Sequence, residues 1–159
     1  MAVSCAGTTN PYFAPLKAGV EDAGAQLGLE MQWGGVPDGN TINQISQFQQ
    51  LVNTGYQAIV VVAFEPDAWI APIKKAMAAG VLVLTSNNDT PHSGRELYFG
   101  QDLVGAAIDQ GRLIAKLAGG KGKVAMTNCA PGSLGLDQRI QGAKQGVAEG
   151  GMEIGRAHV

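Results

Sequence analysis

Short apolar runs alternate with longer amphipathic stretches along the first hundred residues of this sequence. The apolar runs have the β-branched and aromatic content of buried strands. They lie at residues 2–5, 29–33, 58–63, 81–85 and 97–99. Between the first four runs, apolar residues recur every three or four positions, as they do on one face of a helix. This alternation predicts a doubly wound parallel α/β sheet with right-handed crossovers.

The same spacing predicts which helix faces are buried. The apolar positions are Leu16, Val20, Ala23 and Leu27 on the first helix, Ile42, Ile45, Phe48 and Val52 on the second, and Ile70, Ile73 and Met77 on the third. Asn40 or Thr41 can cap the second helix, and Gly28 and Gly80 end the first and the third. The glycine-rich residues 34–39 are expected to form a loop.

A second series of strand and helix begins after Gly100. Gln101 and Asp102 start a helix that ends at residues 119–122, a strand is expected at residues 123–127, and a further helix carries Arg139. These patterns divide the chain into a first lobe, residues 1–100, and the beginning of a second lobe, residues 101–152. We expect the second lobe to be incomplete.

The last seven residues, 153–159, resemble the translated read-through of a common sequencing adapter that ends at a stop codon. We therefore expect a non-native tail and a fragment of a longer protein. Met1 can equally be an internal methionine, since the first strand starts almost at once and no export signal precedes it. On this interpretation Arg156 and His158 carry no function.

Composition narrows the classes of function. The chain has 159 residues, of which 45% are hydrophobic and 15% charged, with a formal net charge of -2. Scattered Lys and Arg form no basic patch for nucleic acid, and no apolar stretch is long enough to span a membrane. Cys5 and Cys129 are too far apart in sequence to predict a bridge, and His92 and His158 have no partners at metal-ligand spacing. The sequence predicts no metal and no cofactor.

The turn after the first strand, residues 6–13, has the composition of a helix start at a ligand site. Asn10 is a good N-cap, and Pro11 has the fixed φ that suits the first helical position. Tyr12 and Phe13 are then placed at the carboxyl edge of the sheet, where open α/β sheets bind ligands. The alternative is that the two aromatic rings only staple the start of the helix.

The order of four segments resembles the ribose-type periplasmic sugar-binding proteins of bacterial ABC importers. These segments are residues 8–13 after the first strand, 85–89 after the fourth, 98–102 at the crossover and 138–142 beyond it. The resemblance covers the chain to about Gly151. It implies the type I fold, with two Rossmann-like lobes that close on a small polyhydroxylated ligand by hinge bending. It also implies a periplasmic location, an ABC permease as partner, and no catalysis.

The resemblance assigns roles to single residues. Asn10 matches the ligand-binding asparagine of the family, Tyr12 and Phe13 match its aromatic pair, and Arg139 matches the arginine of the second lobe. Ribose binders carry Asp-Arg after the fourth strand, where this chain has Asn87-Asn88 and then Asp89. That loop is also similar to the one in binding proteins for a furanosyl autoinducer.

The chemistry of these side chains fits a neutral sugar, which offers hydroxyl groups and C–H faces. The candidate ligand-binding residues are Asn10, Tyr12, Phe13, Glu65, Asn87, Asn88, Asp89 and Arg139. Each has a structural alternative: Asn87 and Asn88 are common turn formers, Glu65 can be a solvated cap, and Arg139 can be a surface charge.

Two other classes of function remain as alternatives. The effector-binding core of a sugar-responsive repressor shares this fold, and an N-terminal helix-turn-helix would distinguish it. A nucleotide-binding enzyme is disfavoured, because residues 6–10 lack the glycine spacing of a dinucleotide turn and Gly119-Gly120-Lys121-Gly122 follows a helix rather than a strand. The sequence shows no pairing of a nucleophile with a base, so we predict no catalytic residues.

Overall fold

The computed structural model describes residues 1–129 and 132–155, and the chain divides into two compact units between Gly100 and Gln101. The first unit is built on a parallel sheet of five strands in the order β2-β1-β3-β4-β5. The strands are Ala2–Cys5 (β1), Gln32–Gly35 (β2), Ala58–Val61 (β3), Leu82–Ser86 (β4) and Leu97–Phe99 (β5). The doubly wound α/β fold expected from the sequence is confirmed.

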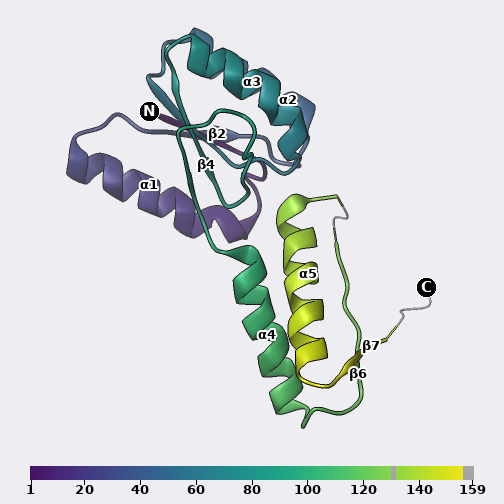
Figure 1. Ribbon diagram of the computed structural model, residues 1–159. Helices are drawn as coiled ribbons and strands as arrows, with labels where there is room; N and C mark the ends of the chain where they lie inside the picture. Colours follow the sequence, from purple (N-terminus) through teal and green to yellow (C-terminus); the bar gives the residue numbers. More distant parts are fainter. Residues whose placement is uncertain (130–131, 156–159) are drawn as a thin grey trace. The chain divides into compact units, whose positions relative to one another are not determined.

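Helices cover both faces of this sheet. Figure 1 shows α1, Ala14–Leu27, on one face, and α2, Thr41–Asn53, with α3, Pro66–Ala78, on the other. The larger core lies beneath α2 and α3, where Phe48 packs edge-to-face on Trp69 with ring centroids 5.4 Å apart. Alternate residues of β3 point into the two faces, which explains its uninterrupted β-branched sequence.

Two of the predicted helix faces are wrong in part. On α2, Ile42 is 80% exposed, whereas Gln44 is fully buried and donates hydrogen bonds from Nε2 to the carbonyls of Ser4 and Val62. A buried glutamine that joins two strands looks polar in the sequence, so the apolar spacing places the face incorrectly. On α1, Leu27 is 70% exposed, and Gly24 is the one buried residue of the helix.

The second strand lies later in the chain than residues 29–33. Gly28 ends α1 with φ 64°, and β2 then pairs from Gln32 to Gly35, so Gly34 and Gly35 of the expected loop belong to the strand. Gly35 has φ 137°, and a Cβ there would lie 2.0 Å from the Cys5 carbonyl oxygen. Glycine is required at this position because the two backbones approach too closely for any side chain.

The connection between β4 and β5 is a loop without a helix. Residues 87–96 join these two parallel neighbours, although parallel strands are usually joined through a longer crossover. The loop is closed by hydrogen bonds among its own side chains, including Thr90 Oγ1 to Ser93 Oγ at 2.9 Å. Its polar sequence therefore has a structural role in addition to any contact with a ligand.

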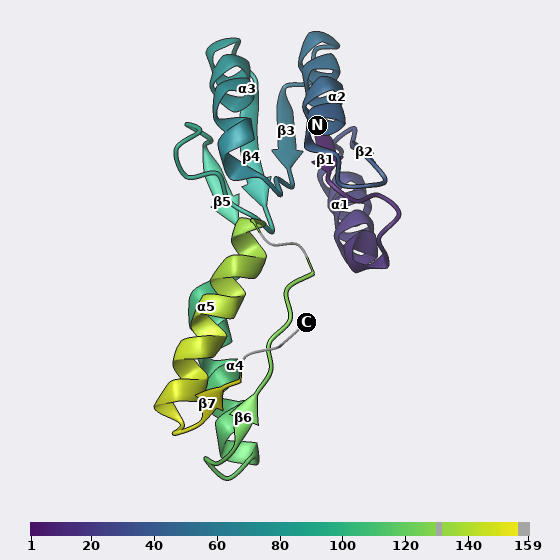
Figure 2. The same ribbon diagram turned by 90° about the vertical axis from the view of Figure 1, so that its right-hand side faces the viewer.

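The second unit is a pair of helices beside a short sheet. Figure 2 shows α4, Leu103–Leu117, alongside α5, Leu134–Glu149. Lys123–Val124 (β6) pairs in parallel with Glu153–Ile154 (β7), so β6 is shorter than the strand predicted at residues 123–127. Two residues of the expected tail thus belong to a strand, and Arg156 and His158 lie outside the described residues.

Among the described residues, no helix has the length and hydrophobicity needed to cross a membrane.

Cys5 and Cys129 are both free thiols, with Cys5 buried and Cys129 exposed. Burial raises the pKa of the Cys5 thiol, against an opposing hydrogen bond from the Gly7 amide, so Cys5 stays protonated at neutral pH.

Candidate ligand-binding site

The loops that follow the strands of the first unit meet at the carboxyl edge of its sheet. The Thr8 amide donates to the Val36 carbonyl over 2.9 Å, and Thr9 Oγ1 donates to the Pro37 carbonyl over 2.8 Å, which ties together the loops after β1 and β2. Strand order reverses between β1 and β3, because β2 and β3 lie on opposite sides of β1. Such a switch point is where open α/β sheets bind their ligands.

Asn10 caps the turn that begins the loop-to-helix transition. Its Oδ1 accepts a hydrogen bond from the Tyr12 amide at 2.9 Å, as expected of an N-cap. The residues after it, Pro11–Phe13, form a 3-10 turn (η1), and the α-helix proper starts at Ala14. Asn10 itself is exposed, so its Nδ2 group can donate to a ligand while Oδ1 holds the turn.

The two aromatic residues of this turn have different surroundings. The Tyr12 side chain is 60% exposed, whereas Phe13 is 3% exposed and packs in a core cluster with Cys5, Ala6 and Val62. Their rings meet edge-to-face with centroids 5.1 Å apart. Tyr12 therefore presents a ring to solvent, and Phe13 supports that ring from beneath.

Glu65 is exposed at the start of α3. Its Oε1 accepts a hydrogen bond from Thr41 Oγ1 at 2.9 Å, which joins the first residue of α2 to the loop after β3. The structure gives no capping hydrogen bond from the Glu65 side chain to α3. Its carboxylate thus has a structural partner on α2, although the residue is exposed.

Asn87 and Asn88 follow β4 directly. Asn87 has φ 67° and is the single residue other than glycine with positive φ in the described part of the chain. Its Nδ2 donates to Tyr12 Oη over 2.9 Å, so the structure brings these two predicted site residues together. Asn88 is 5% exposed, and its backbone N–H donates to the Ser86 carbonyl.

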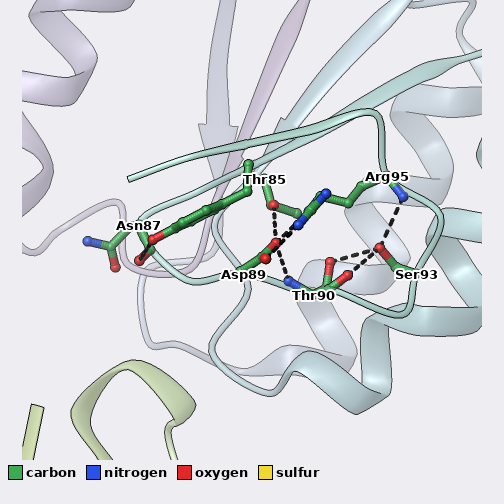
Figure 3. Close-up of polar contacts among 7 residues, drawn as sticks. Thr85, Asn87, Asp89, Thr90, Ser93 and Arg95 are labelled. Atoms are coloured by element: carbon green, nitrogen blue, oxygen red, sulfur yellow. Dashed lines mark hydrogen bonds and ion pairs between the residues drawn. The ribbon is translucent and has the colours of Figure 1, made fainter. Parts of the chain in front are cut away.

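Asp89 is the centre of a polar cluster within the β4–β5 loop. Figure 3 shows its carboxylate facing the Arg95 guanidinium, whose Nε and Nη2 donate to Oδ1 and Oδ2 over 2.5 and 2.6 Å. Thr85 Oγ1 and the Thr90 amide also donate to Oδ1, over 2.9 and 2.7 Å. Its carboxylate is therefore held inside the loop rather than open to a ligand.

The electrostatics of this cluster favour a charged Asp89. Burial raises the pKa of the Asp89 carboxyl, but hydrogen bonds from Arg95, Thr85 and Thr90 outweigh burial and lower it overall. The hydrogen bonds that Arg95 donates to Asp89 in turn raise the pKa of the Arg95 guanidinium. Sequence reasoning missed Arg95, because an arginine six residues beyond an aspartate in an irregular loop has no pattern that distinguishes it from a surface charge.

Arg139, the last of the predicted residues, lies in α5 of the second unit and is half-buried. Near the start of the same helix, Asp137 accepts hydrogen bonds from Asn128 Nδ2 at 2.8 Å and from the Gly132 amide at 3.1 Å. These two bonds hold Asn128 and Gly132 against the first turn of the helix.

A cavity of about 840 Å³ lies at the opposite, amino edge of the sheet in the first unit. It is lined by the α1–β2 connection, by α2 and by the residues before β3, including Glu30, Gln47 and Tyr56. The predicted site residues do not line it. Its position at the amino ends of the strands separates it from the edge where this type of sheet binds ligands.

The parallel sheet with helices on both faces is the fold of the type I periplasmic binding proteins. The chain belongs to the periplasmic binding protein domain family, which its sequence matches over residues 1–158. This confirms the resemblance to the ribose-type sugar-binding proteins of ABC importers.

Individual relatives are sugar-binding proteins. The chain is similar to a xylose/arabinose-binding protein of Sulfolobus acidocaldarius, with 29% identity over 156 residues that cover 90% of this chain and 38% of the relative. It is similar in structure to an ABC transporter solute-binding protein of Burkholderia graminis, solved in complex with D-arabinose. For that pair the TM-score is 0.91 and the identity 27%, over 96% of this chain and 53% of the other.

A third relative is a carbohydrate transporter of Acidothermus cellulolyticus in complex with myo-inositol, with a TM-score of 0.84 and 26% identity. The alignment covers 96% of this chain and 53% of that one. The chain therefore spans 38% of the curated relative and about half of each of these solved structures.

Proposed function

We propose that this protein acts as the substrate-binding protein of a sugar ABC importer, binding a monosaccharide or sugar-like ligand and delivering it to a permease in the periplasm. The observation that carries the proposal is the exposed Tyr12 ring, joined to the Asn87 amide at the switch point of the sheet. The sugar-binding relatives support a role in transport over the effector-binding core of a repressor.

The charges at this edge favour a neutral ligand. The Asp89 carboxylate is held by Arg95, and Glu65 accepts from Thr41, so each predicted carboxylate already has a partner. The exposed Asn10 side chain and the exposed Tyr12 ring remain, which suit hydroxyl groups and the C–H face of a sugar. In this proposal Asn10 binds hydroxyls, Tyr12 packs on the ring, and Phe13, Glu65, the buried Asn88 and Asp89 support the loops.

Arg139 is proposed to donate to sugar hydroxyls from the second lobe, as its match to the family's arginine implies. Ligand binding would then enclose the sugar between two lobes and exclude water, without any bond being made or broken. The proposal requires no cofactor and no catalytic residue.

A titration of this chain with D-xylose, L-arabinose, D-arabinose and myo-inositol, followed by NMR chemical shifts, tests the proposal. We expect weak binding, because the chain spans about half the length of its relatives and both lobes contribute to affinity. We expect Asn10→Asp, which keeps the Oδ1 cap but removes the Nδ2 donor, and Arg139→Met to weaken it further.

Thermal melts of the variants separate loss of binding from loss of folding. Shifts confined to the loops after β1 and β4 would support the proposed site. Absence of any shift with the whole panel would count against a sugar ligand, and micromolar binding would contradict the expectation of weak affinity.

A further inference from the structure

The hydrogen bond between Asn87 and Tyr12 joins two loops whose strands are not neighbours. Tyr12 follows β1 and Asn87 follows β4, and β3 lies between these strands in the sheet. The bond from Asn87 Nδ2 to Tyr12 Oη, 2.9 Å long, therefore spans the carboxyl end of β3. This position adjoins the switch point between β1 and β3, where a ligand is expected.

The Asn87 end of this bond is fixed by its backbone. Asn87 holds a left-handed conformation, with φ 67°, which asparagine tolerates better than most residues. Its carbonyl accepts from Tyr98 Oη at 3.2 Å, and Asp89, two residues later, is held by Arg95. Figure 3 shows the Asn87 side chain pointing away from the Asp89–Arg95 cluster. The loop is thus held by its own bonds, and the side-chain amide of Asn87 points outward from it.

The Tyr12 end is fixed at its base and still open to solvent. The Tyr12 amide donates to Asn10 Oδ1, and its ring meets Phe13 at an interplanar angle of 87°. With Asn87 bonded to the hydroxyl, the ring is held at both ends, yet the side chain remains 60% exposed. A ring held in this way can form one wall of a sugar site.

We propose that Asn87 is a positioning residue that determines specificity: its amide holds the Tyr12 ring in the orientation that a ligand meets. Asn87 acts through Tyr12, because the Nδ2 group that would bind a hydroxyl is directed at the phenol. The inference rests on the proposed function, in which Tyr12 packs on the sugar. A fixed ring accepts one shape of sugar face, whereas a ring free to change χ1 accepts several.

A double-mutant cycle tests whether Asn87 acts through Tyr12. Asn87→Gly removes the amide and keeps the left-handed backbone, and Tyr12→Phe removes the hydroxyl and keeps the ring. We expect each single variant to bind the preferred sugar of the panel about fivefold more weakly and to discriminate less among the four sugars. The double variant should be no weaker than either single variant.

Equal losses from Asn87→Gly with and without the Tyr12 hydroxyl would mean that Asn87 contacts the ligand directly, which overturns the proposal. Tyr56→Phe is the matched control, because Tyr56 bonds Gln32 at the amino edge of the sheet and its hydroxyl should not affect binding. Melting temperatures of all variants identify any that fail to fold.

A measurement without ligand separates this inference from the proposed function. In the ligand-free chain, NMR couplings should show one χ1 rotamer for Tyr12, with contacts between the Asn87 amide protons and the ring. Asn87→Gly should produce rotamer averaging. Averaging already in the unaltered chain, or a single rotamer in both, would overturn the positioning role. If no sugar binds at all, the proposed function fails, and the rotamer result alone decides the role of Asn87.

Discussion

At the scale of single residues, the β4–β5 loop depends on one ion pair. Asp89 and Arg95 are each about one-fifth exposed, so water screens their interaction less than it screens a surface pair. The same carboxylate also accepts from Thr85 and Thr90. No helix lies between β4 and β5, so the hydrogen bonds of this cluster hold the loop and, with it, Asn87.

Replacement of Asp89 by Asn should destabilise the first unit by about 1–3 kcal/mol near neutral pH, since the charged hydrogen bonds are lost. The pKa of Asp89 is lowered in the folded chain. Its contribution is therefore fully present above the unfolded value of about 3.9 and is lost as the pH falls through the folded pKa. Tryptophan-monitored urea unfolding at about pH 7 and at about pH 2.5 measures this.

The difference in the free energy of unfolding between the original chain and Asp89→Asn should be smaller at the lower pH. An equal difference at both would show that Asp89 acts by packing rather than by charge. Glu21→Gln is the control: the exposed pair of Lys17 with Glu21, 3.7 Å apart, should change the free energy of unfolding by less than about 0.5 kcal/mol.

At the scale of elements, α4 and α5 pack closely because glycines line their contact. Gly111 on α4 and Gly142 and Gly146 on α5 all face backbone of the other helix. Gly142 faces Val104 and Gly146 faces Ile108, so residue numbers rise in the same direction along both helices and the two run parallel. Arg112 Nε adds a bond to Glu149 over 2.7 Å at the exposed margin of this contact.

We expect Gly146→Ala to cost about 1–3 kcal/mol or more, because its Cβ would lie 2.0 Å from the Ile108 carbonyl oxygen. Gly19→Ala on α1 is the matched control. A Cβ there meets nothing within 4 Å, so the gain in helix propensity should stabilise the chain by up to about 1 kcal/mol. Far-UV circular dichroism during urea unfolding follows both variants, and a neutral Gly146→Ala would contradict the close packing.

At the scale of the whole molecule, each of the two units has its own core. The first has two hydrophobic clusters around its sheet, and the second has a small one that contains Ala115, Val147 and Met152. Large apolar side chains remain exposed in both units, including Leu27 at 70% and Leu117 at 79%. Because its cluster is smaller, the second unit has less buried apolar surface to offset the conformational entropy that it loses on folding.

We predict that unfolding is not two-state and that the second unit unfolds first. Both tryptophans, Trp33 and Trp69, lie in the first unit, so fluorescence reports on that unit alone, whereas far-UV circular dichroism reports on both. In urea, part of the dichroism signal should be lost before the fluorescence changes. Gly146→Ala should move only this early phase. Coincident transitions would show that the units unfold together.

The local pattern of the sequence was sufficient for the fold and for choosing candidate residues at the carboxyl edge. The β-branched run of β3, the Asn10 cap and the alternation of strand and helix depend on neighbouring residues, so the sequence alone determined them. The aromatic pair and the asparagines remain predicted site residues, and they are candidates for the same reason, since turn chemistry at the carboxyl edge is read from a few adjacent positions.

Only the tertiary structure decided which side chains meet. The burial of Gln44, the pairing of Gly35 with Cys5 and the pairing of Asp89 with Arg95 depend on contacts that no local periodicity encodes. The bond from Asn87 to Tyr12 joins residues 75 positions apart, and it exists because the sheet order sets β4 two places from β1. Sequence determined which groups reach this edge, and the packing of the strands determined which of them bond to one another.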